Sequence, residues 1–149
     1  MTTARDIMSK KLVCLETSVS ATEIAKLMAK NNVSCIILTK DEKPFGIVTE
    51  RDLLTKVTAQ DKKSSEVTAK EVMSSPITLV SSMTPVEEVA QKMVENKVRR
   101  IIVADDGQAV GIITVTDFVK HLNSIVSDSE EYKKSVYENL FDEYELWNY

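Results

Sequence analysis

The sequence predicts an α/β (α+β) fold: two β-α-β-β-α repeats packed with pseudo-twofold symmetry, followed by a C-terminal helical tail. The main observation is an internal repeat. The segment 46–52, Gly-Ile-Val-Thr-Glu-Arg-Asp, returns 65 residues later at 111–117 as Gly-Ile-Ile-Thr-Val-Thr-Asp, and Met8-Ser9 returns as Met73-Ser74. A unit repeated in this way covers its apolar face with its own copy, so we expect a tandem pair with a groove between the copies.

Each repeat is predicted to contain the same elements in the same order. A short helical turn precedes a β-rich run, and a helix follows whose apolar residues recur at i, i+3, i+4 and i+7. Two β-rich runs joined by a polar turn then form a hairpin, and a last helix starts within the repeated motif. Before that last helix, the elements cover 6–9, 12–15, 21–28 and 35–49 in the first copy, and 71–74, 77–80, 86–93 and 100–114 in the second.

The repeats also set the predicted domain boundaries. The first repeat covers 1–58, the polar segment 59–70 lacks an apolar period and is interpreted as a linker, and the second repeat covers 71–123. Residues 124–149 form an acidic, aromatic tail. Its apolar side chains at Val136, Leu140, Tyr144 and Trp147 have roughly helical spacing. This pattern fits either a helix docked on its own body or a contact with an oligomer or partner protein.

Charge and composition exclude several classes of protein. Residues 128–149 carry seven acidic residues and two lysines, a net charge of −5, whereas the whole chain has −4. The body is therefore close to neutral and offers no basic surface for nucleic acid. No apolar run reaches the ~20 residues that span a bilayer, and the N-terminus lacks the core of a signal peptide, so we expect no membrane partner and a cytoplasmic location.

The residue inventory predicts neither a catalytic nor a metal site. Cys14 and Cys35 are not repeated and are expected to be reduced, mostly buried thiols. The sole histidine, His121, aligns with Lys56 and is expected at the surface. One histidine and two separated cysteines cannot supply a zinc set, and the chain has no glycine-rich phosphate loop. We therefore expect that the protein is not an enzyme and needs no obligatory cofactor.

The repeated motif admits two interpretations. Thr49-x-x-Asp52 and Thr114-x-x-Asp117 can be capping boxes, in which the two side chains satisfy free amides at a helix start. The same corner can instead bind a nucleotide. The helix N-terminus suits a phosphate, the threonine hydroxyl adds a donor, and the aspartate can accept both hydroxyls of a ribose.

In these residues the chain resembles the cystathionine-β-synthase (CBS) domain family, arranged as the paired Bateman module, over about residues 4–123. The two Gly-h-h-Thr-x-x-Asp motifs (h, apolar), the Met-Ser openings, the element order and the duplication carry the resemblance. It implies a non-catalytic regulatory, energy-sensing module that binds an adenosine compound in clefts between the repeats. AMP is the first candidate, with ADP, ATP or S-adenosylmethionine as others. It further implies signalling by a change of conformation or association, a homodimer, and a regulated protein still to be identified.

The resemblance also assigns site residues. Thr49 and Asp52 would serve one cleft, and Thr114 and Asp117 the other. Three arginines are expected to neutralise phosphate groups, although each can also be a solvated surface residue. These arginines are Arg51, Arg99 and Arg100. Thr116 of the second motif is a further expected ligand-binding residue. The adenine is expected to lie among residues for which a role in the core is equally open: Val13, Val33, Ser34, Cys35, Ile77, Thr78 and Val98.

A different function class remains open. In it the pair is a ligand-free scaffold for dimerisation or protein interaction, and the threonine and aspartate of each motif only cap helices.

Overall fold

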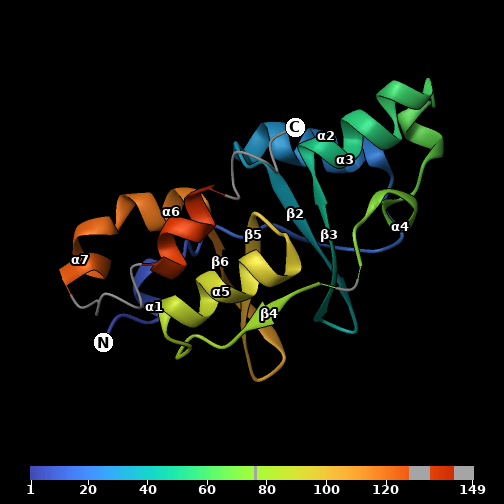
Figure 1. Cartoon of the computed structure of the whole chain (residues 1–149). Coiled ribbons are helices and arrows are strands. Elements are labelled where there is room, and N and C mark those ends of the chain that lie inside the picture. Colours follow the sequence, from blue (N-terminus) through green and yellow to red (C-terminus); the bar gives the residue numbers. More distant parts are fainter. Residues whose placement is uncertain (76, 128–134, 143–149) are drawn as a thin grey trace. The chain divides into compact units, whose positions relative to one another are not determined.

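The computed structural model describes residues 1–75, 77–127 and 135–142, and it divides into two compact units (Figure 1). Unit 2 consists of Leu12–Ile77. Unit 1 combines Met1–Lys11 with Thr78–Tyr149. Each unit contains one three-stranded mixed sheet and its covering helices, which confirms the predicted α/β fold with two β-α-β-β-α repeats.

In unit 2, β1 and β2 pair in parallel, and β2 and β3 pair antiparallel. Alternate side chains of the strands point to one face, where Ile36, Leu38 and Val48 are fully buried against helices α2 and α3. Short 3-10 turns at Thr58–Gln60 and Ser64–Glu66 lead to helix α4. The elements are β1 (Cys14–Glu16), α2 (Ala21–Asn31), β2 (Cys35–Lys40), β3 (Lys43–Thr49), α3 (Glu50–Lys56) and α4 (Ala69–Val72).

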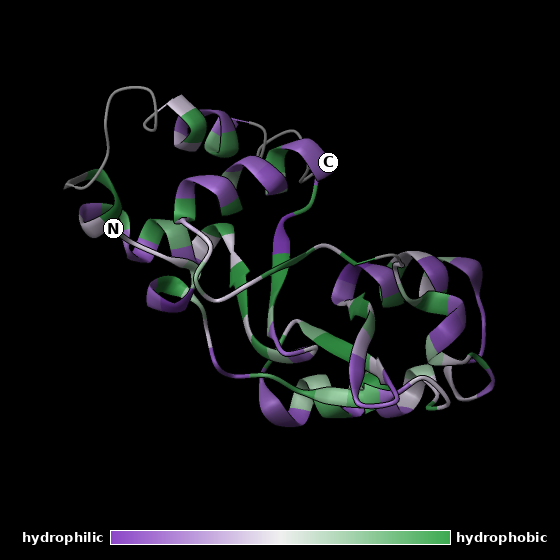
Figure 2. Ribbon diagram, turned by 90° about the horizontal axis from the view of Figure 1, so that it is seen from below, coloured by the Kyte–Doolittle hydropathy of each residue, from purple (hydrophilic) through white to green (hydrophobic). Residues whose placement is uncertain are grey.

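Unit 1 repeats this plan with sheet order β4-β5-β6. In Figure 2 the strands are mostly hydrophobic, whereas the helices alternate between hydrophobic and hydrophilic residues, as expected for helices with one buried face. The last helix of the repeat is interrupted at His121, so α6 and α7 are separate elements. The elements are α1 (Ala4–Ile7), β4 (Leu79–Val80), α5 (Val86–Asn96), β5 (Arg100–Asp105), β6 (Gln108–Thr114), α6 (Val115–Lys120) and α7 (Leu122–Ser127).

The opening segment of each sequence repeat packs in the unit built from the other repeat. The backbone of Ser9 exchanges two hydrogen bonds with Ile112 at 2.9 and 3.0 Å, and Ser74 does the same with Ile47 at 2.9 and 3.2 Å. The segment 59–70, interpreted from the sequence as a linker, also contributes to unit 2. Its Val67 and Ala69 are buried in the core of unit 2. The compact units therefore combine pieces of both repeats.

The glycine of each repeated motif leaves room for the methionine of the opening segment that packs in the same unit. A Cβ at Gly111 would collide with the side chain of Met8, and a Cβ at Gly46 would lie 2.6 Å from Met73 Sδ. Both methionines follow a short helix, α1 or α4, that is capped by its own Thr-x-x-Asp or Thr-x-x-Glu box. The Met-Ser opening and the motif glycine are thus two halves of one packing contact.

This contact predicts a compensating pair of substitutions. Gly111→Ala should destabilise the protein by about 1–3 kcal/mol, because the added methyl group overpacks the site against Met8. Met8→Ala in the Gly111→Ala background should recover part of this loss, since it removes the colliding atoms. Urea unfolding of the two single variants and the double variant measures the coupling, and strictly additive effects would contradict the contact.

The C-terminal helix, residues 135–142, is docked on unit 1. Tyr137 is 4% exposed and Leu140 is fully buried, and both belong to the core cluster that contains Phe118. The rings of Phe118 and Tyr137 lie 6.0 Å apart at 49°. Of the two interpretations of the tail, these residues support the docked helix; Tyr144 and Trp147 lie outside the described residues.

Candidate functional site

The first strand-to-helix corner is at the junction of β3 and α3. Thr49 is the N-cap, and its backbone N–H donates to Asp52 Oδ2 at 2.8 Å, while Asp52 N–H donates to Thr49 Oγ1 at 3.2 Å. The other oxygen, Asp52 Oδ1, forms an ion pair with Lys56 Nζ at 3.0 Å. Lys56 also donates to the carbonyl of Val72 at 2.9 Å. Both carboxylate oxygens of Asp52 therefore have protein partners.

The second corner, between β6 and α6, has the same cap but a different environment. Thr114 N–H donates to Asp117 Oδ2 at 2.8 Å, and the Thr114 hydroxyl donates to the same oxygen at 3.2 Å. His121 occupies the position equivalent to Lys56. Its Nδ1 lies 2.9 Å from the backbone carbonyl oxygen of Asp117, and it does not contact the Asp117 carboxylate. Within the described part of the chain, Asp117 Oδ1 has no hydrogen-bond or ion-pair partner.

The capping interpretation is therefore correct for the geometry of both corners. Each aspartate is at most 9% exposed, and one carboxylate oxygen of each accepts a hydrogen bond from the N-cap of its own helix. What distinguishes the corners is the second oxygen, which Lys56 occupies in the first and which stays available in the second. The motif can cap a helix with one oxygen and accept a hydroxyl with the other.

Arg100 lies beside the second corner. It begins β5 and pairs across the sheet with Thr114, whereas Cys35 takes the equivalent place opposite Thr49. Arg100 Nε is buried and has no hydrogen-bond partner among the described residues. A buried N–H without an acceptor is unfavourable by about 1–3 kcal/mol, and more when it belongs to a charged group. The second corner thus combines a cationic donor that lacks an acceptor with a carboxylate oxygen that lacks a donor.

The other expected polar residues are more peripheral. Arg51 and Thr116 are exposed at the first turn of α3 and α6, and Arg99 is half-buried immediately before β5. In the adenine neighbourhood, the carbonyls of Val13 and Thr78 accept hydrogen bonds from β2 and β5 at 2.9 and 3.3 Å. The remaining expected residues, none of them exposed except Ser34, are Val33, Ser34, Cys35, Ile77 and Val98.

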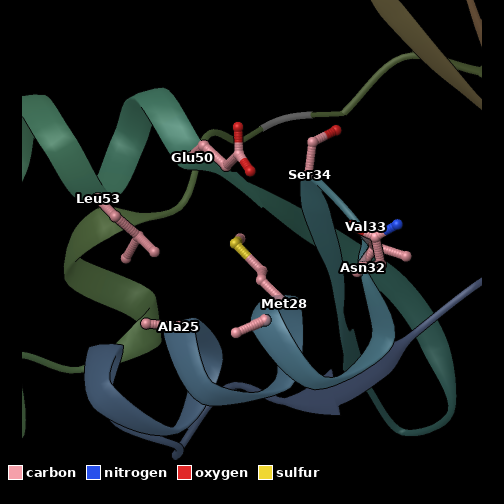
Figure 3. Close-up of a pocket in the computed structure, with 8 residues that line it drawn as sticks. Ala25, Met28, Asn32, Val33, Ser34, Glu50 and Leu53 are labelled. Atoms are coloured by element: carbon pink, nitrogen blue, oxygen red, sulfur yellow. The ribbon is translucent and has the colours of Figure 1, made fainter.

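A hollow on the helical face of unit 2 gathers Val33 and Ser34 but neither Thr49 nor Asp52 (Figure 3). Its volume is about 480 Å³. Met28 points into it, and Glu50 and Ser34 stand at its edge. The hollow is lined by Ala25, Met28, Ala29, Asn32, Val33, Ser34, Glu50 and Leu53. The hollow therefore borders the repeated motif at Glu50 but does not include the capping pair Thr49 and Asp52.

Two expectations from the sequence require correction. Neither cysteine forms a disulfide, but Cys14 is exposed instead of buried, because its side chain alternates with those of Val13 and Leu15, which pack on the core. His121 is half-buried instead of a surface residue, since it closes the end of α6 on the carbonyl of Asp117. Among the described residues, no group of histidine, cysteine and carboxylate side chains could hold a metal ion, and no helix could cross a membrane.

Comparison with known proteins identifies the family. The model of the CBS domain matches the chain twice, at residues 4–59 and 69–124. The chain belongs to the CBS domain family. Both matches include the strand-to-helix corner of the respective repeat, so the two corners are equivalent positions of one family motif.

Individual relatives are consistent with this assignment. The chain is 37% identical over 123 residues to the uncharacterized protein MK0525 of Methanopyrus kandleri, covering 81% of this chain and 63% of that protein. The hexameric CBS-CP12 protein from bloom-forming cyanobacteria has a TM-score of 0.79 and 26% identity, covering 89% of this chain and 78% of that one. The CBS domain protein PAE2072 from Pyrobaculum aerophilum, solved in complex with AMP, has a TM-score of 0.73 and 27% identity, and the match covers 85% of this chain and 99% of that one.

Proposed function

We propose that this CBS pair is a regulatory module that binds an adenine nucleotide, with AMP as the first candidate, and that the Thr114–Asp117 corner is the stronger site. The observation that carries the proposal is the buried, unpartnered Nε of Arg100, cross-strand from Thr114. A phosphate oxygen supplies the acceptor that this guanidinium lacks, and guanidinium–phosphate hydrogen bonds are charge-assisted. The AMP complex of the similar protein PAE2072 supports this ligand class.

The free oxygen of Asp117 complements the arginine. A ribose hydroxyl can donate to Oδ1 without disturbing the cap that Oδ2 makes with Thr114. At the first corner a ligand has to displace Lys56 from Asp52 Oδ1, and no arginine occupies the position of Cys35. We therefore expect unequal affinities, with the Thr114–Asp117 corner occupied first and the Thr49–Asp52 corner requiring a higher AMP concentration.

Calorimetric titration with AMP, ATP and S-adenosylmethionine tests the proposal directly. We expect saturable heat with AMP that fits a tight and a weak site. The absence of heat with all three compounds would refute nucleotide binding and favour the scaffold function, in which the motif is only a cap. The same titration followed by light scattering tests the signal, because a ligand shifts conformation or association only if it binds one state better than the other.

Substitution of Arg100 separates binding from stability. Arg100→Leu should weaken AMP binding at the tight site by about 10–100-fold, since it removes a charge-assisted hydrogen bond. The melting temperature without ligand should not fall, because the change also removes a buried donor that lacks an acceptor. Calorimetry and thermal unfolding measure the two effects.

Arg51→Leu is the matched control for that substitution. Arg51 is exposed in the first motif, so its loss should leave the tight site unchanged. Equal loss of affinity in both variants would contradict the assignment of the stronger site to the second corner. An unchanged affinity in Arg100→Leu would remove the main support for the proposal.

The regulated partner, the cytoplasmic location and the homodimer belong to the same proposal. A module without catalytic residues acts by presenting a ligand-dependent surface to another protein or to a second copy. The similar CBS-CP12 protein is a hexamer, so association of chains occurs in related structures. A mass measurement of this protein with and without AMP determines whether association is the step that the ligand controls.

A further inference from the structure

Lys56 connects the first strand-to-helix corner to helix α4. It lies in the last turn of α3, and its Nζ is 3.0 Å from Asp52 Oδ1. The same ammonium donates to the carbonyl of Val72 at 2.9 Å. A lysine ammonium carries three donors, so the two contacts exist at the same time. The side chains of Lys56 and Asp52 are 40% and 12% exposed, so the ion pair is partly shielded from solvent and salt.

The carbonyl of Val72 lies at the point where the chain leaves unit 2. Val72 is the last residue of α4, and unit 1 begins shortly afterwards at Thr78. The last carbonyl groups of a helix have no partner within the helix, and a nearby lysine can supply one. Met73 follows directly and packs on Gly46 of the first motif. Lys56 therefore stabilises the helix end from which the backbone continues towards unit 1.

The second corner has no such connection. His121 stands at the position of Lys56, and its Nδ1 lies 2.9 Å from the backbone carbonyl oxygen of Asp117. The counterpart of Val72 is Ile7, the last residue of α1. A lysine at position 121 would therefore find equivalent acceptors in Asp117 Oδ1 and the Ile7 carbonyl. The two corners differ by one side chain that can be exchanged between them.

We propose that Lys56 controls the first corner: it competes with a ribose hydroxyl for Asp52 Oδ1, and its release by a bound nucleotide is transmitted to the end of α4. This inference rests on the proposed function, because it requires a nucleotide at that corner. The first corner then responds to a rise in nucleotide concentration by loosening the backbone after Val72. The second corner binds its ligand without breaking an ion pair.

The competition follows from the populations of the free corner. A ligand that needs a free Asp52 Oδ1 binds with an affinity reduced by the fraction of molecules in which Lys56 has left that oxygen. The same ligand favours the released state, because it binds that state better than the paired one. One contact thus lowers the affinity of the first corner and makes its occupancy change the protein.

Exchange of the side chain between the corners tests the competition. Lys56→Met removes the ammonium and keeps an apolar stem, so it should strengthen AMP binding at the weaker site by about 5–10-fold. His121→Lys introduces the competing donor beside Asp117 and should weaken AMP binding at the tight site by about 5–10-fold. Calorimetric titration of the unaltered chain and the two variants with AMP measures both changes.

Lys70→Met is the matched control. Lys70 is exposed on α4, so this variant has the same net charge as Lys56→Met and alters the same helix without touching Asp52. It should change neither AMP affinity. An equally strengthened weak site in Lys70→Met would attribute the effect to net charge and overturn the proposal.

Amide exchange without nucleotide tests the connection to α4 separately. Ser74 N–H donates to the Ile47 carbonyl at 2.9 Å, and Ser9 N–H makes the equivalent bond to Ile112 at 2.9 Å. Lys56→Met should speed exchange of the Ser74 amide by about 3–10-fold, because the helix end before it loses a partner. The Ser9 amide should be unchanged. In the unaltered chain, AMP at a concentration that fills both sites should have the same selective effect on Ser74.

The outcomes separate this inference from the proposed function. Two-site binding of AMP that is unchanged in both Lys56→Met and His121→Lys would overturn the competition and leave the nucleotide sites standing. An exchange rate of Ser74 that does not respond to Lys56→Met would overturn the transmission to α4. The absence of heat with AMP in the unaltered chain and in every variant would refute the proposed function, and the role of Lys56 with it.

Discussion

Phe118→Ala should lower the free energy of unfolding of unit 1 by about 3–5 kcal/mol, the range for truncating a fully buried phenylalanine. Phe118 belongs to a cluster to which α1, α5, β5, β6 and the C-terminal helix also contribute. Its removal leaves a cavity and also takes away the ring that Tyr137 contacts at 6.0 Å. The C-terminal helix should therefore lose its protection from amide exchange before the rest of unit 1 does.

Leu53→Ala is the matched control, because Leu53 occupies the same position in the first repeat. It is half-buried at the edge of an open hollow, so its truncation should destabilise unit 2 by only about 1 kcal/mol in the monomer. Urea unfolding followed by circular dichroism gives both values. Similar losses in the two variants would mean that the C-terminal helix contributes little to the burial of Phe118.

The repeated pattern predicts the fold well because each copy contains a complete set of local signals. The helical stripe of α2 and α5, the two hairpins and the capping boxes all follow from short-range spacing. What the pattern does not reveal is which copy each opening segment joins. Met8 and Met73 have similar local sequences, each preceded by an acidic and a β-branched residue and followed by serine, so only the tertiary structure shows that Met8 packs on Gly111 and Met73 on Gly46.

The position of Arg100 also depends on information that the pattern does not contain. A regular hairpin closed by the turn at Asp106 and Gly107 would place Arg100 opposite Ile113. A bulge between Val103 and Ala104 shifts the register by one residue, so Arg100 lies opposite Thr114. The charge of Arg100 is visible in the sequence, but its place beside the corner results from the bulge.

The difference between Asp52 and Asp117 has a signal in the sequence. Lys56 follows Asp52 by four residues, a spacing that favours an ion pair on a helix, whereas His121 follows Asp117. In the sequence, the alignment of His121 with Lys56 indicates only a surface position for the histidine. Its consequence for the carboxylate, a free oxygen at only one corner, became visible with the hydrogen bonds.

Asp117→Asn should weaken AMP binding at the tight site by about 10–100-fold, because it replaces a charged acceptor of ribose hydroxyls with a neutral amide. The asparagine carbonyl can still accept from Thr114 N–H, as Oδ2 does at 2.8 Å, so the helix cap and the melting temperature should be largely retained. Calorimetry with AMP and thermal unfolding of the same preparation measure the two quantities.

Asp52→Asn provides the comparison at the first corner. There the carboxylate is already engaged by Lys56 at 3.0 Å, so the substitution should leave the tight AMP site unchanged and affect only the weaker one. A fall in melting temperature without a change in AMP affinity, in either variant, would assign that aspartate to capping alone. If both variants kept full affinity, the duplicated motif would serve the fold, and the ligand would bind elsewhere or not at all.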